Sequence, residues 1–281
     1  MPRLHTDGLQ VRYNEKVIIH DLHIEIPDKK ITTIIGSNGC GKSTLLKAMT
    51  RIIPHQKGSI IFDGKEIAHA HTKQLAKKMA ILPQTQESAS GLTVGELVSY
   101  GRYPYQNGFG RLSKRDHEII DWALEVTNAI DFKYLQVDSL SGGQRQRIWI
   151  AMSLVQETEM IFLDEPTTYL DMAHQLEVLE LLQKLNEEED RTIVMVLHDI
   201  NQAARFADYI IALKDGKIIQ SGTNHEVIQT DILRQVFQID ALIGTDPRTN
   251  QPYCMTYNLI KGETNYEKTY SNSTPTISDL G

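Results

Sequence analysis

The 281-residue sequence contains only two cysteines, Cys40 and Cys254. They are too few and too far apart to indicate a disulfide framework, so a reducing compartment such as the cytosol is expected. Long hydrophobic runs are also missing: the longest, such as residues 148–152 and 193–197, have five residues. A helix that crosses a bilayer needs about 20, and the first ten residues lack the regions of a secretory signal. We therefore expect neither a membrane-spanning protein nor a secreted, disulfide-rich one.

An excess of positive charge is absent as well. The chain has 29 Lys and Arg against 36 Asp and Glu, which gives a net charge of −7. Proteins that bind nucleic acid usually carry a basic excess or a basic stripe. No nucleic-acid partner is expected on this ground, although a local basic patch is compatible with an acidic total.

What the sequence does contain is a series of strand patterns. Apolar residues at positions 22, 24 and 26 alternate with polar ones, the period of a half-buried strand. Residues 30–35, 160–163 and 192–197 are continuous β-branched or apolar runs, typical of strands that are buried on both faces. The Asp63-Gly64 turn predicts a hairpin.

Helical patterns alternate with these strands. One helix is expected from about residue 42 to before Pro54, one from about residue 142, and an amphipathic one over residues 176–185. Strands that alternate with helices predict an α/β fold with a mostly parallel sheet, covered on both faces. A second Asp-Gly hairpin, over residues 210–222, closes this core.

Two segments differ from the rest of the chain. Residues from about 88 to 140 lack strong strand runs, and residues 116–130 repeat apolar side chains at helical spacing, which predicts a mostly helical insertion. Residues 261–281 are polar, and we expect a poorly ordered tail there. The predicted organisation is one domain over residues 1–260 followed by this tail.

The strongest local motif matches G-x-x-x-x-G-K-[ST] and lies between an apolar strand and a helix, which is the context it requires. Glycines let successive backbone N–H groups point at phosphate oxygens, and the helix N-terminus adds positive potential. The motif predicts that Lys42 binds the β- and γ-phosphates and that the Ser43 hydroxyl binds Mg²⁺. The predicted nucleotide-binding residues here are Gly36, Ser37, Asn38, Gly39, Cys40, Gly41, Lys42, Ser43 and Thr44.

A second motif is the apolar run 160–163 followed by two carboxylates, Asp164 and Glu165. Such a strand places its last residues at the carboxyl edge of the sheet, where ligands bind in folds of this class. We predict that Asp164 belongs to the Mg²⁺ shell and that Glu165 is the general base for the attacking water. A solvated strand end would be the commoner explanation for either carboxylate if it stood alone.

A third motif, Leu-Ser-Gly-Gly-Gln at residues 140–144, resembles the signature sequence of ABC-type ATPases, which ordinary P-loop enzymes lack. Ser141 has the character of a helix N-cap, and Gly142 and Gly143 let backbone donors reach an anion. In isolation the same residues could be only a capped helix. The resemblance implies that Ser141, Gly142, Gly143 and Gln144 contact ATP.

Four further residues match this family by position. Gln84 resembles the glutamine that touches the Mg²⁺ site, and His198 resembles the switch histidine that contacts the γ-phosphate. Asp171 matches the aspartate of the loop that crosses between two subunits. Tyr13 lies where the family stacks an aromatic ring on adenine, although an exposed tyrosine without a role is an alternative.

The resemblance covers about residues 3–260 and implies an α/β P-loop NTPase fold: a RecA-like core, an antiparallel β subdomain and an inserted α-helical subdomain. It implies ATP and Mg²⁺ as cofactors. It also implies a homodimer in which each ATP lies between one copy's phosphate loop and the other copy's Ser141 and Gly143. The expected location is the cytoplasmic face of the cell membrane, as a peripheral protein.

Longer stretches of the sequence resemble the ATPases of bacterial iron(III)-siderophore importers, with haem and vitamin B12 importers as close relatives. These stretches are Gly-Arg-Tyr-Pro-Tyr-Gln at 101–106 and residues 170–182 and 196–208. Such ATPases act on a transmembrane permease, and an extracytoplasmic binding protein supplies the cargo. The region from 85 to 106 resembles the groove for a permease helix, and we expect the glycines at 91, 95 and 101 to let it move.

Two other classes stay open. A soluble ABC ATPase acting on nucleic acid or ribosomes usually carries two nucleotide domains or a long coiled-coil insertion, and this chain has one phosphate loop and no sustained heptads. A P-loop kinase would leave the signature and His198 without a function. An ATPase of an importer is therefore the favoured interpretation.

Overall fold

The computed structural model describes residues 2–84, 89–106, 111–168 and 170–260. Its strands form three sheets, in the spatial orders β2-β1-β4-β5, β10-β9-β3-β8-β7-β6 and β11-β12. The strands are β1 (Leu4–Tyr13), β2 (Lys16–Ile26), β3 (Ile31–Gly36), β4 (Lys57–Phe62), β5 (Lys65–Glu66), β6 (Met79–Leu82), β7 (Met160–Asp164), β8 (Thr192–Val196), β9 (Tyr209–Lys214), β10 (Lys217–Gly222), β11 (Ile239–Thr245) and β12 (Pro252–Leu259). The helices are α1 (Lys42–Met49), α2 (Thr72–Leu75), α3 (Val94–Ser99), α4 (Lys114–Val126), α5 (Gly142–Leu154), α6 (Met172–Glu189), α7 (Ile200–Phe206), α8 (Asn224–Val227) and α9 (Thr230–Phe237).

The six-stranded sheet is the centre of the molecule. Strands β3, β6, β7, β8 and β9 are parallel, and β10 pairs antiparallel with β9 at the edge. Its central strands are apolar throughout because both faces are covered. In β7, Phe162 belongs to one hydrophobic core and Leu163 to the other, as the period of two in a strand requires. The predicted α/β fold with a parallel sheet is confirmed.

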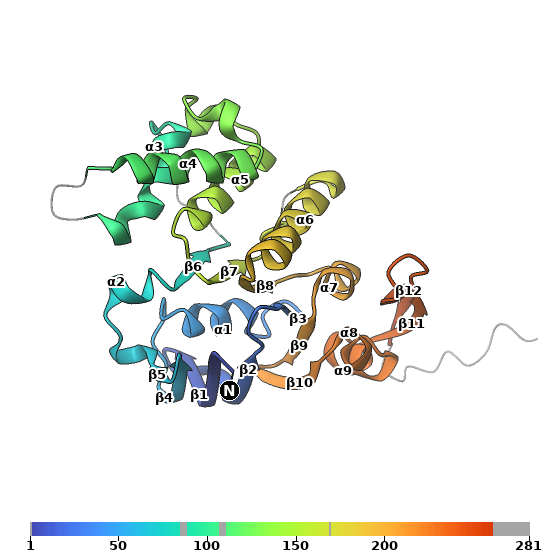
Figure 1. Cartoon of the computed structure of the whole chain (residues 1–281). Coiled ribbons are helices and arrows are strands. Elements are labelled where there is room, and N and C mark those ends of the chain that lie inside the picture. The colour runs from blue at the N-terminus through green and yellow to red at the C-terminus, as the bar shows by residue number, and fades with distance from the viewer. Residues whose placement is uncertain (1, 85–88, 107–110, 169, 261–281) are drawn as a thin grey trace, which may run out of the picture.

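One core lies between this sheet and the four-stranded antiparallel sheet. Helix α1 fills the space between them (Figure 1) and buries Leu45, Leu46 and Met49 there. The other core lies on the opposite face of the central sheet, against α5, α6 and α7. None of the helices in the described parts of the chain is long and apolar enough to cross a bilayer.

Helices and short 3₁₀ turns occupy the described part of residues 88–140, and α3, α4 and α5 stand together above the central sheet (Figure 1). The 3₁₀ turn Tyr100–Tyr105 packs on α5 so closely that a Cβ atom at Gly101 would lie 2.3 Å from the carbonyl oxygen of Met152. Gly101 therefore serves close packing, which does not favour the expectation that it provides mobility. The next residue, Arg102, is 3% exposed and donates hydrogen bonds to Asp116 (2.7 Å) and to the Val155 carbonyl (2.6 Å).

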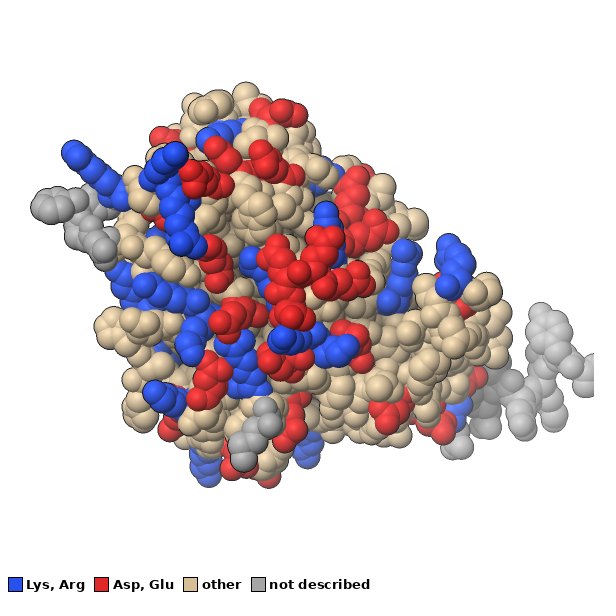
Figure 2. Space-filling model, in the orientation of Figure 1, with Lys and Arg blue, Asp and Glu red and all other residues tan. Residues whose placement is uncertain are grey.

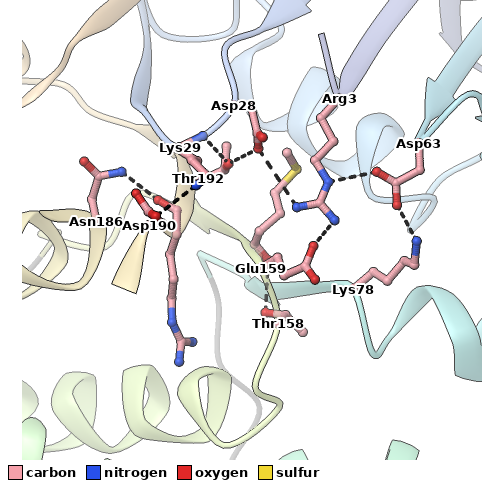
Figure 3. Close-up of polar contacts among 12 residues, drawn as sticks. Arg3, Asp28, Lys29, Asp63, Lys78, Thr158, Glu159, Asn186, Asp190 and Thr192 are labelled. Atoms are coloured by element: carbon pink, nitrogen blue, oxygen red, sulfur yellow. Dashed lines mark hydrogen bonds and ion pairs between the residues drawn. The ribbon is translucent and has the colours of Figure 1, made fainter. Parts of the chain in front are cut away.

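A polar network joins the antiparallel sheet to the amino ends of the central strands (Figure 3). Arg3 at the start of the chain pairs with Asp63 (2.8 Å), which follows β4, and with Glu159, which precedes β7. Asp28 accepts a 2.9 Å hydrogen bond from the Thr192 hydroxyl of β8. These contacts fix the amino edge of the sheet, on the side away from the predicted site.

The C-terminal part of the described chain holds an element that the sequence patterns did not indicate. Strands β11 and β12 form an antiparallel hairpin from Ile239 to Leu259, which packs beside α7 and α9 (Figure 1). Asn201 of α7 holds it by exchanging two hydrogen bonds with the backbone of Cys254. The predicted tail, residues 261–281, lies outside the described residues.

Candidate active site

The carboxyl ends of four neighbouring strands meet at one edge of the central sheet, in the order β3, β8, β7 and β6. The residues that follow these strands line one cleft of about 490 Å³. Its lining consists of Tyr13, Ile18, Asn38, Gly39, Gly41, Lys42, Ser43, Thr44, Gln84, Glu165, Thr168 and His198. The sheet topology therefore brings together residues that are far apart in the sequence.

The phosphate loop connects β3 to α1. At Gly36 a Cβ atom would lie 2.2 Å from the Leu213 carbonyl oxygen, so only glycine lets β3 turn beside β9. Gly41 has φ 108° and precedes α1 without any side-chain cap on the first N–H groups. These groups are free to bind an anion at the helix N-terminus. Cys40 is buried at the back of the loop, and burial raises the pKa of its thiol.

Lys42 is buried in the loop, 5% exposed, with its ammonium group held by backbone oxygens. Its Nζ donates hydrogen bonds to the carbonyls of Gly36 (2.9 Å) and Ser37 (3.1 Å). A buried cation whose partners are uncharged carbonyls is not neutralised. Lys42 therefore supplies a net positive charge to the floor of the cleft.

Ser43 and Asp164 form a pair of oxygen ligands beside this lysine. The Ser43 hydroxyl donates a 2.7 Å hydrogen bond to Asp164 Oδ1, while the buried Oδ2 has no hydrogen-bond partner. Burial raises the pKa of Asp164, against the hydrogen bond from Ser43 and the charge of Lys47. A bound cation would satisfy the free oxygen and favour the charged form. The set fits Mg²⁺, which takes one or two carboxylates and completes its shell with water and phosphate oxygens.

Glu165 lies at the centre of a network of three donors. Gln84 Nε2 donates to Oε2 at 2.6 Å, and the Thr168 hydroxyl donates to the same oxygen at 3.1 Å. The ring Nε2 of His198 lies 2.6 Å from Oε1. Glu165 has φ 56°, a left-handed backbone conformation that is uncommon for a residue with a side chain and is typical of functional sites.

Thr168 is the member of this network that the sequence patterns did not indicate. A threonine four residues after a strand, here the second of two adjacent threonines, carries no spacing or composition signal. Only the turn after β7, in which Thr168 N also bonds the Glu165 carbonyl at 3.2 Å, brings its hydroxyl to the carboxylate.

The remaining predicted residues lie at the rim of the cleft or outside it. Tyr13, 47% exposed, lines the rim. Ser141 caps α5 in a reciprocal box with Gln144, as predicted, on an exposed surface that is not part of the cleft lining. Asp171 caps α6, also outside the lining. Within one chain the structure thus brings the phosphate loop, Gln84, Asp164, Glu165 and His198 together, but neither the signature turn nor Asp171.

Sequence comparison agrees with this geometry. The family model for the ABC transporter matches residues 19–168, which include the phosphate loop, the signature turn and both carboxylates. A relative from Bacillus subtilis, an iron(3+)-hydroxamate import ATP-binding protein, is 60% identical over 94% of this chain and 98% of its own length. The chain belongs to the ABC transporter family. Like the ATP-binding members of this family to which it is similar, the chain is an ATPase.

Further relatives of this ABC ATPase are a petrobactin import ATP-binding protein of Bacillus anthracis and the ferric enterobactin transport ATP-binding protein of Escherichia coli. They are 50% and 42% identical over 90% and 89% of this chain, and 92% of each relative is covered. Among solved structures, an inward-facing metal-chelate type ABC transporter superposes with a TM-score of 0.78 at 27% identity, over 90% of this chain and 96% of that one. A dimeric bacterial ABC transporter cassette superposes with a TM-score of 0.71 at 28% identity, over 78% and 98%. The predicted RecA-like P-loop fold with its two subdomains is confirmed.

Proposed function

We propose that this chain is the ATP-hydrolysing subunit of an importer for iron(III)-siderophores, and that two copies close around two ATP molecules to drive a permease. The observation that carries the proposal is the position of Glu165. Its carboxylate is held by Gln84, Thr168 and His198 in the cleft that the phosphate loop also lines. A base fixed beside a triphosphate site is the arrangement that hydrolysis requires.

In the proposed reaction, the phosphate loop and Lys42 hold the β- and γ-phosphates. A water oxygen attacks the γ-phosphorus, its proton passes to Glu165, and the bond to the oxygen that stays with ADP breaks. His198 orients Glu165 and contacts the γ-phosphate, and Gln84 links the carboxylate to the metal region. Ser43, Asp164 and Gln84 would hold Mg²⁺, which when bound neutralises the charge of the phosphate oxygens.

Two copies are required because one chain leaves its signature turn outside its own cleft. The Ser141 hydroxyl and the free N–H groups of α5 are exposed, and an anion is the natural ligand of such a helix terminus. In a head-to-tail pair, Ser141 and Gly143 of one copy would complete the γ-phosphate site of the other, with Asp171 crossing between them. The similarity of this chain to a dimeric cassette supports the pairing of two copies.

The cargo assignment depends on the relatives. Their names specify iron(3+)-hydroxamate, petrobactin and ferric enterobactin, all of them iron-siderophore systems. Haem or vitamin B12 import is the second candidate, because the family resemblance includes these systems. The ATPase itself does not touch the cargo in either case.

The permease would contact the helical part of the chain. The 3₁₀ turn Tyr100–Tyr105 carries two exposed aromatic rings, Tyr100 and Tyr103, 57% and 72% exposed. Exposed aromatic side chains close together are typical of protein interfaces. The proposed groove extends over residues 85–106, of which 85–88 lie outside the described residues.

This interface would place the protein at the cytoplasmic face of the membrane, with an extracytoplasmic binding protein supplying cargo to the permease. The nucleotide domain would extend over residues 1–260.

Charge distribution does not favour the nucleic-acid alternative. On the face in Figure 2, acidic side chains gather over the middle and Lys and Arg lie beside and among them, so that the described residues of this face do not form an extended stripe that is basic alone. Nucleic-acid binding depends on such a stripe.

The test of hydrolysis and dimerisation is Glu165→Gln. We expect this variant to bind ATP, to turn over very slowly and to elute as a dimer with ATP but as a monomer without it, because the ligand that joins the copies is no longer removed. Lys42→Ala is the control that should lose nucleotide binding or hydrolysis. Normal turnover by Glu165→Gln would contradict the assigned base, and a monomer at saturating ATP would contradict the dimer.

The cargo is tested in a bacterium that lacks its own siderophore ATPase. Expression of the chain with its cognate permease should restore growth on iron(III)-hydroxamate as the sole iron source, and Glu165→Gln should not. If growth were restored only with haem as the iron source, or if only cobalamin were taken up, haem or vitamin B12 import would be the function. Crosslinking the purified complex tests the groove: permease contacts are expected between residues 89 and 106.

A further inference from the structure

The signature turn and the Asp171 loop meet within one chain at a single imidazole. A Cβ atom at Gly143 would lie 3.2 Å from His174 Cδ2, 3.4 Å from Cγ and 3.6 Å from Nε2, so the ring lies against the glycine. At its other edge, His174 Nδ1 is 2.7 Å from Asp171 Oδ2. His174 therefore touches both elements that the chain is proposed to present to a partner.

Local structure explains why the ring lies there. Asp171 is the N-cap of α6, and its Oδ1 accepts a 3.0 Å hydrogen bond from the backbone N–H of His174. This fixes His174 in the first turn of α6, directed at the first turn of α5. The His174 backbone bond, and then its ring, also lower the pKa of Asp171, so the carboxylate stays charged and able to bind the imidazole.

A second contact makes the two helices one unit. One turn further along each helix, Arg147 of α5 forms an ion pair with Glu177 of α6. The ion pair keeps α5 and α6 side by side, but it lies one helical turn away from the signature turn and the Asp171 loop. The contact at the loop ends themselves is the His174 ring, between Gly143 and Asp171.

We propose that His174 is a positioning residue that locks the signature turn to the Asp171 loop, so that one copy presents both elements to its partner's ATP in a single fixed arrangement. The inference rests on the proposed ATP-bound dimer and assigns to it a residue outside the nucleotide cleft. Holding the two loops in place before association lowers the entropy lost on binding. His174 thus acts on assembly of the dimer, and not on the phosphate loop or the base.

This role predicts a particular pattern of kinetic effects. His174→Ala removes the ring from Gly143 and the partner from Asp171. The ATP concentration for half-maximal hydrolysis should then rise about fivefold, the effect of losing one hydrogen bond of average strength, while kcat at saturating ATP changes much less. In the Glu165→Gln background, the ATP concentration that gives half dimer should rise by the same factor.

Three controls separate positioning from a general structural effect. In His174→Asn the amide nitrogen can take the place of Nδ1 and the amide oxygen that of Cδ2, so this variant should recover most of the loss. His117→Ala removes an exposed histidine from the first turns of α4 and should change neither quantity. ADP affinity of the monomer should be the same in all variants, because His174 does not line the cleft.

The outcomes are distinct. A fivefold shift in the ATP requirement with recovery by Asn supports the proposal. An unchanged ATP requirement in His174→Ala, a loss of kcat alone, or an Asn variant as impaired as the Ala variant would overturn it. If Glu165→Gln with His174 intact fails to dimerise, the proposed function fails first, and the inference fails with it.

Discussion

Gln84 Nε2 and Glu165 Oε2 lie 2.6 Å apart and form a hydrogen bond that connects the loop after β6 to the loop after β7. Gln84 also opens the segment that leads to the proposed permease groove. The side chain that fixes the base is therefore attached to the part of the chain that would contact the membrane partner. A displacement of Gln84 itself would break or lengthen its hydrogen bond to Glu165.

Thr168 is expected to support the base through the same carboxylate oxygen that Gln84 binds. Thr168→Val keeps the shape of the side chain but removes the hydroxyl that donates to Glu165 Oε2 at 3.1 Å. We expect kcat for ATP hydrolysis to fall about fivefold, which corresponds to about 1 kcal/mol for one lost hydrogen bond. KM for ATP should stay the same, because Thr168 holds the base and not the phosphates. Steady-state phosphate release measures both constants.

Thr168→Ser is the matched variant for this prediction. It keeps a hydroxyl at the same position and should retain most of the activity. A Val variant with full kcat, or a Ser variant as slow as the Val variant, would show that the hydroxyl does not act on Glu165.

Much of this site follows from sequence because each motif comes directly after a strand of one parallel sheet. Once β3, β6, β7 and β8 are recognised as neighbours, Lys42, Gln84, Glu165 and His198 must lie at the same edge. Thr168 could not be found this way, since its contact depends on the shape of a turn. Whether Ser141 reaches a nucleotide also cannot follow from one chain, because it lies outside the cleft of that chain.

The parts of the fold that were missed depend on tertiary contacts. The hairpin β11–β12 has no Asn-Gly or Asp-Gly turn, and its position is set by the bonds between Asn201 and the Cys254 backbone. In the Gly-Arg-Tyr-Pro-Tyr segment, the pattern alone suggests a turn. The structure shows a 3₁₀ turn with Gly101, Arg102 and Pro104 buried, in which Tyr105 Oη donates a 2.8 Å bond to the Gln156 carbonyl and the ring lies against the Arg102 guanidinium.

The polar network at the amino edge of the sheet predicts a pH-dependent contribution to stability. Burial alone would raise the pKa of Asp63, but the hydrogen bonds and charges of Arg3 and Lys78 outweigh it and hold this pKa below its usual value (Figure 3). A lowered folded-state pKa stabilises the protein above the unfolded value of about 3.9. This stabilisation is lost as the pH falls through the folded-state pKa.

Asp63→Asn is the test, because Asn tolerates the left-handed backbone at this position, where φ is 49°. At pH 7 the free energy of unfolding should decrease by about 1 kcal/mol, the upper range for a partly exposed pair. Urea denaturation should show the difference from wild type shrinking below about pH 4, as Asp63 becomes protonated. Asp131→Asn, at an exposed carboxylate, should show no such trend. A difference that is constant with pH would contradict the ionic origin.

Gly101 is expected to be intolerant of any side chain, for a reason of packing. A Cβ atom there would lie 2.3 Å from the Met152 carbonyl oxygen and 2.4 Å from Val155 Cγ2, and a backbone oxygen in a helix cannot move aside easily. Gly101→Ala should therefore lower the free energy of unfolding by about 1–3 kcal/mol through overpacking.

At Gly142 a Cβ atom would meet nothing within 4 Å, so Gly142→Ala is the matched control and should be neutral in urea denaturation. If Gly101 were instead a flexible joint, its Ala variant would keep its stability and lose only coupled ATPase activity. Urea denaturation of both variants, with ATP hydrolysis measured for Gly101→Ala against the wild type, therefore distinguishes a packed glycine from a hinge.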